Sequence, residues 1–476
     1  MNYVFYDFET SGINLNFDQP IQIAAALVDE DFKIIDEFNY TCKLKDGVVP
    51  NPTALLVNKV KITQLKNDIS FYEMMEKVNN KFEEWSPATF IGYNSIWFDE
   101  EVLRNSLFQS LYDPYITNTK QNCRGDLFKI VLALIPLDLN LIKVPINPKT
   151  DKPSYKLEAL AKANNILHET AHDAMSDVIA TIGLAELIKN KNKEFWEECM
   201  NSISHDLLLN HLTSDEYFFA APTHTNSAKL TPLVLLTSNP NYKKELAFFD
   251  LNHKIEDHEE ARVSAIYSLI ESKQKIIKLL KSNKAPILFS RTYIKNNPCF
   301  KDTEFDKLSK EADKAKSSTS FIDNLNQALV DRLDDFQVNQ PQPEYLEKTL
   351  YSGFSGPTDR LKMKNFRNEK DPKKKYKISN EFEDKRLKEI SKRIIYSEYP
   401  DELTDNERDQ RQAFIARKVF DEEKDIKVEW CTIKKAKEAI NNLRENEKFK
   451  NEEDYINEIE EYIIDEERRY KKYLIS

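Results

Sequence analysis

The stretch Phe5-Tyr6-Asp7-Phe8-Glu9-Thr10 joins an apolar strand to two acidic residues two positions apart. Residues i and i+2 of a β-strand point to the same side, so Asp7 and Glu9 project together from the end of this strand. Two neighbouring carboxylates repel each other unless a cation lies between them, and a divalent metal ion meets that need. The alternative is an exposed acidic strand end, which the Asp-x-Glu pattern alone does not exclude.

Two further acidic positions extend this candidate site. Asp99 follows a short apolar strand and a polar loop, near the start of a predicted helix, where N-capping is the alternative role. His172 and Asp177 lie five positions apart at the entry to another predicted helix, whose positive end favours anionic groups. With an ordinary pKa of about 6.5, His172 can accept a proton at neutral pH.

This set of residues suits metal-dependent phosphodiester hydrolysis. Two-metal hydrolysis uses cations about 3.5–4 Å apart that flank the scissile phosphate. Hard oxygen ligands favour Mg²⁺, or Mn²⁺, over zinc. We therefore predict a site for two Mg²⁺ ions with His172 as general base and four carboxylates as ligands: Asp7, Glu9, Asp99 and Asp177.

Hydrophobic patterning divides the chain into three regions. Residues 1–195 alternate strands and helices, which indicates a mixed sheet covered by helices. Residues 196–350 carry short apolar runs between turns and helical stretches, as in a small α+β domain. Residues 355–476 are rich in Lys, Glu and Arg with almost no Gly or Pro, which predicts long helices. Strands are expected at 3–6, 21–28, 34–42 and 88–92, and helices at 99–111, 157–164 and 174–189.

Charge is unevenly distributed along the chain. The formal net charge of −11 argues against general nucleic-acid binding, but charge can be segregated by region. Residues 351–400 hold 14 Lys and Arg against 8 Asp and Glu, a net of +6. We expect this basic block to border a nucleic-acid path or to hold a partner's acidic tail, with Lys373, Lys374 and Lys375 contributing. A solvated helix face is the alternative.

Cysteine spacing and the first residues bear on the compartment. The five cysteines form no CxxC pair, so neither a disulfide framework nor a zinc site is expected. The N-terminus lacks the features of a signal peptide, and the most apolar stretch, 127–142, is too short and too polar to span a bilayer. A cytoplasmic protein without membrane contact is the natural expectation.

The order of the motifs resembles that of the DEDDh exonuclease superfamily, which has a ribonuclease H-like fold. The shared features are Asp-x-Glu, an Asp after a short strand, and a His five residues before the last Asp. More closely, the chain resembles the bacterial exonuclease I family over nearly its full length, most strongly before residue 195. The stretches that carry the resemblance are 7–10, 92–94, 98–102, 112–115, 157–164, 171–177 and 350–354.

The exonuclease I resemblance implies an α/β architecture in three domains. These are an exonuclease domain at 1–195, an SH3-like domain at 196–350 and a helical domain at 355–476. It also implies 3′→5′ degradation of single-stranded DNA to 5′-mononucleotides, in DNA repair and recombination. It further implies a monomer that docks to single-stranded-DNA-binding protein.

Single strands are held by basic groups on phosphates and by aromatic rings on bases. Arg104 lies on the same predicted helix as Asp99, and Tyr115 follows that helix. Lys156 begins a later helix, where the resemblance places a basic contact near the 3′-terminal nucleotide. Surface salt bridges are the alternative for Arg104 and Lys156. Trp97 stands where the family would place a polar or basic residue, and its ring offers a stacking face instead. The predicted substrate contacts are Glu9, Arg104, Tyr115 and Lys156.

Other functions share parts of this pattern. RNA exonucleases and proofreading exonucleases use the same catalytic set, and spacing alone does not separate DNA from RNA. The two extra domains favour DNA, since RNA-trimming relatives tend to be little more than a catalytic domain. A catalytically silent binding module is disfavoured because all five catalytic positions are filled. An HD phosphohydrolase built on His172-Asp173 needs further His ligands, which lie after residue 200 apart from His168.

Overall fold

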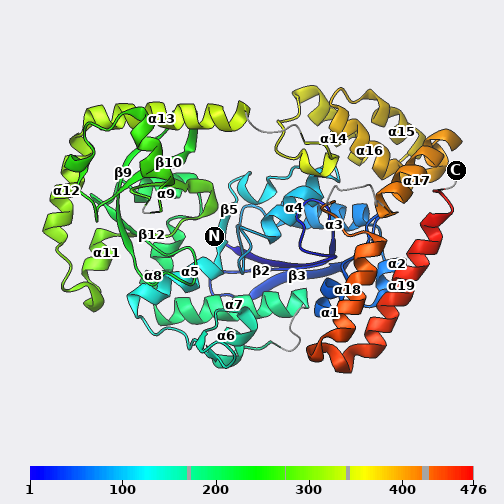
Figure 1. Ribbon diagram of the computed structural model, residues 1–476, viewed down its shortest axis with the longest axis horizontal. Helices are drawn as coiled ribbons and strands as arrows, with labels where there is room; N and C mark the ends of the chain where they lie inside the picture. The colour runs from blue at the N-terminus through cyan, green and yellow to red at the C-terminus, as the bar shows by residue number, and fades with distance from the viewer. Residues whose placement is uncertain (169–172, 274, 339–342, 421–427, 475–476) are drawn as a thin grey trace.

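The structure, a computed structural model, describes residues 1–168, 173–273, 275–338, 343–420 and 428–474. It has an N-terminal part built on a mixed sheet, a middle part built on an antiparallel sheet, and a C-terminal part made of helices. The middle part and the C-terminal helices lie on opposite sides of the N-terminal sheet (Figure 1). The order of strands and helices expected for the three regions is confirmed.

The N-terminal sheet has the strand order β3-β2-β1-β4-β5. Strand β1 runs antiparallel to β2 and parallel to β4, so the sheet is mixed, as predicted. The apolar run of β2 is buried along almost its whole length, as expected for a strand covered on both faces. The strands are β1 (Tyr3–Thr10), β2 (Pro20–Val28), β3 (Ile34–Thr41), β4 (Thr89–Gly92) and β5 (Cys123–Asp126).

Helices surround this sheet and carry the other predicted motifs. The helices expected at 99–111, 157–164 and 174–189 are present as α4, α6 and α7 within three residues of the predicted ends. A short hairpin of β6 (Ile146–Asn147) and β7 (Lys152–Pro153) precedes α6. The helices are α1 (Pro52–Asn58), α2 (Ile62–Asn67), α3 (Phe71–Glu84), α4 (Asp99–Phe108), α5 (Leu127–Leu134), α6 (Leu157–Ala163), α7 (Ala174–Lys191) and α8 (Lys193–Met200).

The middle part contains a five-stranded antiparallel sheet in the order β11-β10-β9-β8-β12. This confirms the expected small α+β unit; its SH3-like character is consistent with the fold. Its strands are β8 (Phe218–Ala220), β9 (Thr231–Asn239), β10 (Tyr242–Asp250), β11 (Ile277–Lys281) and β12 (Leu288–Ser290). Its helices are α9 (His205–His211), α10 (Val263–Glu271), α11 (Arg291–Lys295), α12 (Phe305–Ser317) and α13 (Thr319–Val338).

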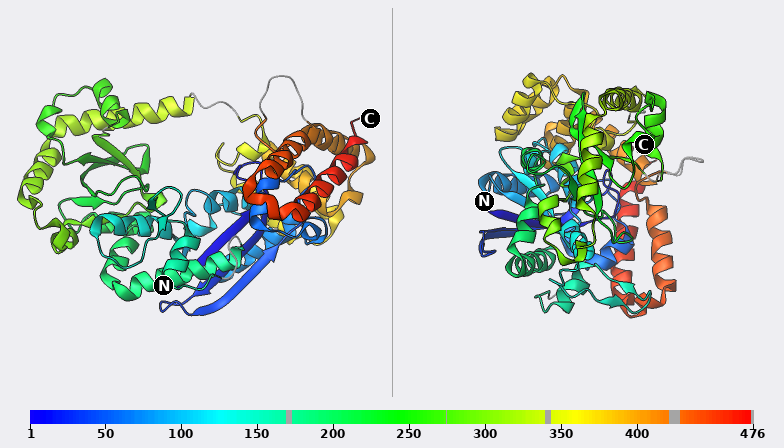
Figure 2. Two further views of the ribbon diagram at one scale, coloured as in Figure 1. Left: turned by 60° about the horizontal axis from the view of Figure 1, so that its bottom comes forward. Right: turned by 90° about the vertical axis from the view of Figure 1, so that its left-hand side faces the viewer.

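The C-terminal part is helical, as predicted. Helices α18 and α19 pack beside α1 and α2 of the N-terminal part, where the orange and red ribbons meet the blue ones (Figure 2). The helices are α14 (Pro357–Asn368), α15 (Pro372–Glu381), α16 (Lys385–Glu398), α17 (Asp405–Phe420), α18 (Ile433–Glu445) and α19 (Glu453–Lys471).

One lysine of the basic block is not a surface residue, contrary to its predicted role. Lys373 and Lys374 are exposed, whereas Lys375 is buried. Its ammonium group lies 5.0 Å from the ring centre of Phe366 and 5.4 Å from that of Tyr72. Lys375 therefore lies on the buried face of α15. Its replacement does not test docking of DNA or of a partner protein.

Packing joins the three parts into one body. One hydrophobic cluster runs from Phe5 in β1 through Trp196 in α8 to Phe249 and Phe289 in the middle sheet. A second cluster joins the N-terminal part to Phe366 of α14 and other residues of α14–α16. Within the described part of the chain, no helix has the length and apolar character needed to cross a membrane.

Candidate active site

Three of the predicted carboxylates meet at one end of the central strand. Asp7 and Glu9 come from β1 and Asp177 from the first turns of α7, and one oxygen of each lies within 4.8 Å of the others. Asp173 caps α7 by accepting a hydrogen bond from the Ser176 amide at 3.1 Å. Its other oxygen accepts one from Gln22 of β2 at 3.0 Å, which fixes the start of the helix against the sheet.

Asp99 is the fourth carboxylate, and the sheet topology brings it close. The carboxyl ends of the parallel strands β1 and β4 share an edge, and the loop after β4 leads to Asp99 at the start of α4. Its Oδ1 accepts a hydrogen bond from the amide of Phe8, the residue between Asp7 and Glu9, at 3.1 Å. Asp99 is buried, and its charge raises the pKa of Asp7.

The loop that delivers Asp99 is shaped by a residue that sequence reasoning missed. Asp126, at the end of β5, accepts hydrogen bonds from the amides of Asn94 at 2.9 Å and Ile96 at 3.2 Å. Asn94 has a left-handed backbone with φ of 62°, and a side chain at Gly92 would come within 2.9 Å of the Tyr6 carbonyl. An acidic residue at the end of a parallel strand next to β4 was the available signal.

Burial and the charges of neighbouring carboxylates raise the pKa values of Asp7, Glu9 and Asp99. Burial, then the charges of Asp99 and Glu9, raise the pKa of Asp7 well above its usual range. Burial, then the charge of Asp177, raises the pKa of Glu9 to about 9. Burial also raises the pKa of Asp99 to about 7. A divalent cation would keep these groups ionised, and an all-oxygen donor set fits Mg²⁺ or Mn²⁺.

A histidine that sequence reasoning did not select touches this cluster. His168 Nε2 lies 2.5 Å from Asp177 Oδ1. The predicted general base, His172, lies outside the described residues. Both histidines precede α7 by a few positions, so the spacing to Asp177 alone favoured His172 and gave no reason to consider His168.

Lys156 lines a cavity that reaches the cluster. The cavity has a volume of about 560 Å³ and includes His168, Asp177 and Tyr93 in its walls. Lys156 is exposed at the N-terminus of α6, and it forms no ion pair with any residue that the structure describes. Its predicted contact with substrate stays a prediction, but the surface salt bridge offered as the alternative is absent from the described residues.

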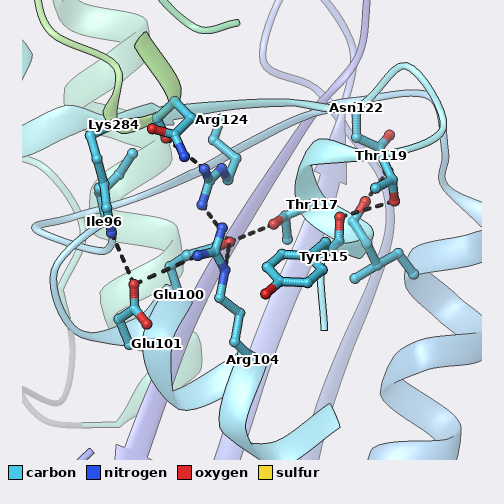
Figure 3. Close-up of polar contacts among 12 residues, drawn as sticks. Ile96, Glu100, Glu101, Arg104, Tyr115, Thr117, Thr119, Asn122, Arg124 and Lys284 are labelled. Carbon is cyan, nitrogen blue, oxygen red and sulfur yellow. Dashed lines mark hydrogen bonds and ion pairs between the residues drawn. The ribbon is translucent and has the colours of Figure 1, made fainter. Parts of the chain in front are cut away.

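Arg104 is held inside the protein (Figure 3). It is 4% exposed, and its Nε lies 3.0 Å from Glu100 Oε1. Its guanidinium stacks over the ring of Tyr115 at 5.2 Å and donates a hydrogen bond to the Tyr351 hydroxyl at 3.2 Å. The charge of Arg104 is thus balanced within the protein, and the half-buried Tyr115 ring is the more accessible of these two predicted contacts.

Aromatic side chains next to this region are exposed. Tyr115 lies 6.0 Å from Phe354, whose side chain is 85% exposed in the segment before α14. Trp97, in the loop that delivers Asp99, is 65% exposed and stacks on Phe98 at 6.1 Å. These rings offer surfaces on which nucleic-acid bases can stack.

Glu100 is the centre of a buried polar network, also drawn in Figure 3. Besides Arg104, it accepts hydrogen bonds from Arg124 at 2.6 Å, Thr117 at 2.7 Å and Tyr6 at 3.0 Å. Burial alone would raise the pKa of Glu100, but the charges of Arg124 and Arg104 outweigh it, so this pKa is lowered. Its stabilising effect is therefore present above an unfolded-state pKa of about 4.3 and lost as the pH falls through the folded-state value.

Replacing Glu100 with Gln is expected to lower the free energy of unfolding by about 3–5 kcal/mol, because the buried guanidinium of Arg124 loses its counter-charge and that of Arg104 keeps only Glu101, at 3.7 Å. Chemical denaturation at neutral pH measures this change. Glu83→Gln is the matched control, since Glu83 pairs with Lys120 at the surface and its loss should cost about 0.5 kcal/mol or less. Equal effects of the two variants would contradict the buried network.

Comparisons with known proteins agree with this fold. A family model described as exonuclease matches residues 4–185, and one described as exonuclease I C-terminal domain matches residues 344–465. An exodeoxyribonuclease I from Buchnera aphidicola subsp. Acyrthosiphon pisum is 29% identical over 408 residues, which cover 82% of this chain and 95% of that protein.

Solved structures extend the similarity to the whole chain. Exonuclease I from Methylocaldum szegediense has a TM-score of 0.82 at 22% identity, covering 98% of this chain and 99% of that one. Escherichia coli exonuclease I in complex with a dA16 oligonucleotide has a TM-score of 0.79 at 22% identity, covering 99% of this chain and 100% of that one. Fold and carboxylate cluster together define an exonuclease. The chain belongs to the exonuclease I family.

Proposed function

We propose that this protein degrades single-stranded DNA from its 3′ end and releases 5′-mononucleotides. The observation that carries the proposal is the meeting of Asp7, Glu9 and Asp177 at the sheet edge, with Asp99 hydrogen-bonded to the strand between the first two. The cavity that contains Lys156 reaches the cluster at Asp177, and it offers a phosphate backbone a place to lie.

The proposed ligands of two divalent ions are Asp7, Glu9, Asp99 and Asp177. When bound, such ions activate a water molecule and stabilise the leaving oxygen of a phosphodiester. His172 is the proposed acceptor of the water proton, as the spacing to Asp177 indicates. Asp177 is positioned for its role by the capped first turn of α7 and by the contact with His168.

DNA is the proposed substrate, and single strands are the proposed form. The similar structure from E. coli is a complex with a DNA oligonucleotide. The exposed rings of Trp97 and Phe354 and the half-buried ring of Tyr115 suit unpaired bases, which a duplex would hide in its stack. A role in DNA repair and recombination follows from such an activity, and an RNA substrate is the alternative.

We also propose that the protein docks to the single-stranded-DNA-binding protein, acts as a monomer and works in the cytoplasm. One similar solved structure is of SSB and exonuclease I. Exposed members of the basic block, Lys373, Lys374 and Lys377, are the candidates for contacts with an acidic tail. A triple neutralisation should use these three and leave the buried Lys375 in place.

Lys156→Ala is expected to weaken single-stranded DNA binding and to make the slope of log K against log salt shallower by roughly 0.7, the value for one phosphate contact. The reason is that Lys156 lines the cavity at the cluster and has no ion-pair partner among the described residues. Binding should be measured without Mg²⁺, so that the ligand is not consumed. Lys162→Ala, an exposed lysine on the same helix, is the control. A slope that changes equally in both variants would place Lys156 outside the DNA path.

One comparison of substrates tests the proposed function. Single-stranded DNA, single-stranded RNA of the same sequence and blunt duplex DNA should be incubated with Mg²⁺. We expect mononucleotides from the first, and slower release from the other two. Preference for RNA would replace the proposal with its alternative, and binding of single-stranded DNA without degradation in either Mg²⁺ or Mn²⁺ would make the protein a binding module.

A further inference from the structure

A second cavity lies between the N-terminal part and the C-terminal helices. Its volume is about 420 Å³, within the usual range of roughly 300–1,000 Å³ for small-molecule sites. Residues 43–48 and 70–72 form one wall, and residues of α16 and α17 form the other. The four proposed metal ligands are absent from its lining, so this cavity is separate from the candidate active site.

Basic side chains outnumber acidic ones around this cavity. Glu347 accepts hydrogen bonds from Arg393 at 3.0 Å and Lys418 at 3.3 Å. Glu389, which is 45% exposed, receives Arg393 at 2.9 Å and Arg411 at 3.4 Å. The fourth cation is Lys45, whose ammonium donates to the neutral Gln109 at 2.8 Å. Arg393, Lys418 and Arg411 thus share two carboxylates, which leaves an excess of one positive charge, and Lys45 adds a second when it is protonated.

Other charged residues in the lining do not remove this excess. Asp46 is paired with Arg469 at 2.5 Å, and Arg408 is paired with Asp405, which lies outside the cavity. Lys43, which also lines the cavity, adds a further positive charge. The exposed residues Phe414 and Arg469 lie on the side that opens to solvent.

Burial and neighbouring positive charges destabilise the protonated forms of Arg411 and Lys45. Arg411 Nε is buried and has no hydrogen-bond partner among the described residues. Burial, then the charge of Arg393, lowers the pKa of Arg411 to about 10. Burial lowers the pKa of Lys45 to about 7, even though Glu347 acts in the opposite direction. A doubly charged anion would relieve the repulsion and supply the acceptor that Arg411 Nε lacks.

We propose that this cavity binds a small phosphate monoester or inorganic phosphate as a dianion, held by Arg411, Arg393 and Lys418. The opposing walls include Phe71, Ile390 and Tyr396, so an apolar or planar body attached to the phosphate can also be accommodated. Two sources share this chemistry: free phosphate, and the 5′-mononucleotides that the proposed activity releases. Only the second source depends on the proposed function; binding of the anion does not.

The test uses the full-length protein in EDTA, where no turnover occurs. Phosphate, thymidine 5′-monophosphate and thymidine are each titrated at constant ionic strength by calorimetry, with thermal unfolding as a second measurement. We expect saturable binding of phosphate with a rise in Tm. Tighter binding of the monophosphate, with none of thymidine, would assign the site to mononucleotides. Phosphate and monophosphate of equal affinity would assign it to phosphate alone.

Arg411→Gln is the diagnostic variant. It is expected to weaken phosphate binding by roughly tenfold to a hundredfold, the usual effect of one charge-assisted hydrogen bond. The Tm of the ligand-free variant should stay equal or rise, because an excess buried charge is removed, and this separates lost binding from misfolding. Arg417→Gln is the matched control, since Arg417 is exposed on the same helix outside the cavity. Its effect on affinity should be about twofold or less because exposed charges are screened.

Lys418→Gln serves as a second variant and should also weaken binding, because it removes one of the three cations proposed to hold the phosphate. Glu347 keeps Arg393 as a partner, so the variant should still fold. Three results overturn the proposal: no saturable phosphate binding by the wild-type protein, unchanged affinity in both cavity variants, or an equal loss of affinity in Arg417→Gln.

Discussion

Replacing Asp7 with Asn is expected to lower the rate of DNA degradation at least roughly 10³-fold, because a preorganised charged group at the reacting phosphate contributes that much to catalysis. The same change should raise the Tm of the metal-free protein. Asp7 is partly buried and lies beside Glu9, Asp99 and Asp177, and the mutual repulsion of these carboxylates is relieved only when a cation or a proton is present.

The two expected effects of Asp7→Asn have opposite signs: activity falls, whereas the Tm of the metal-free protein rises. Activity should be measured on single-stranded DNA with saturating Mg²⁺, and thermal unfolding should be followed in EDTA. Asp31→Asn is the matched control, because Asp31 is an exposed acid in the turn between β2 and β3. A less active and less stable Asp7→Asn protein would mean that Asp7 serves the fold, not a metal ion.

His172→Ala is expected to lower kcat by roughly 10²–10⁴-fold, the range for a lost general base, while DNA binding is largely kept. His168→Ala should behave differently, because His168 contacts the proposed ligand Asp177. Loss of a residue that orients a metal ligand typically costs roughly 10–100-fold in metal affinity or activity. Its defect should therefore shrink as the Mg²⁺ concentration rises.

The two histidine variants are compared by titrating Mg²⁺ at saturating DNA. The expected pattern is a low kcat at every Mg²⁺ concentration for His172→Ala and a shifted Mg²⁺ requirement for His168→Ala. The reverse pattern would assign the general base to His168 and leave His172 without a catalytic role. A DNA-binding measurement for both variants shows that any loss is not a failure to take up substrate.

Local sequence rules predicted the parts of the site that depend on them. The two-residue period of a strand places Asp7 and Glu9 on one side, and the parallel pairing of β1 with β4 brings Asp99 to the same edge. The helix entry before Asp177 was predicted from the sequence, and the structure shows Asp173 as its capping residue. These features are set within a few residues of each motif or by regular sheet geometry.

Features that depend on distant partners were not predictable in this way. The spacing of Arg104 from Asp99 suggested a cleft position, but Glu100 and Arg124 draw it into a buried network. Lys375 looked like part of a solvated basic run, but aromatic rings from three other segments surround its ammonium group. Hydrophobic and charge patterns identify a helix face, and only tertiary packing decides what covers it.

The cavity that we propose binds phosphate also depends on residues that are distant in the chain. Lys45 and Arg411 are separated by more than three hundred residues in the chain, and each alone resembles an ordinary surface cation. Their shared enclosure appears only when the C-terminal helices close on the N-terminal part. Sites built between domains therefore escape motif-based reasoning even when the individual domains are recognised.

The proposed polarity and metal requirement are tested together by degrading 5′-labelled single-stranded DNA in Mg²⁺, in EDTA, and in EDTA followed by excess Mg²⁺. The carboxylate cluster predicts a ladder of labelled strands that shorten from the 3′ end, no products in EDTA, and full recovery when Mg²⁺ is restored. Immediate release of the 5′ label as a mononucleotide would contradict the polarity, and undiminished degradation in EDTA would contradict the metal site.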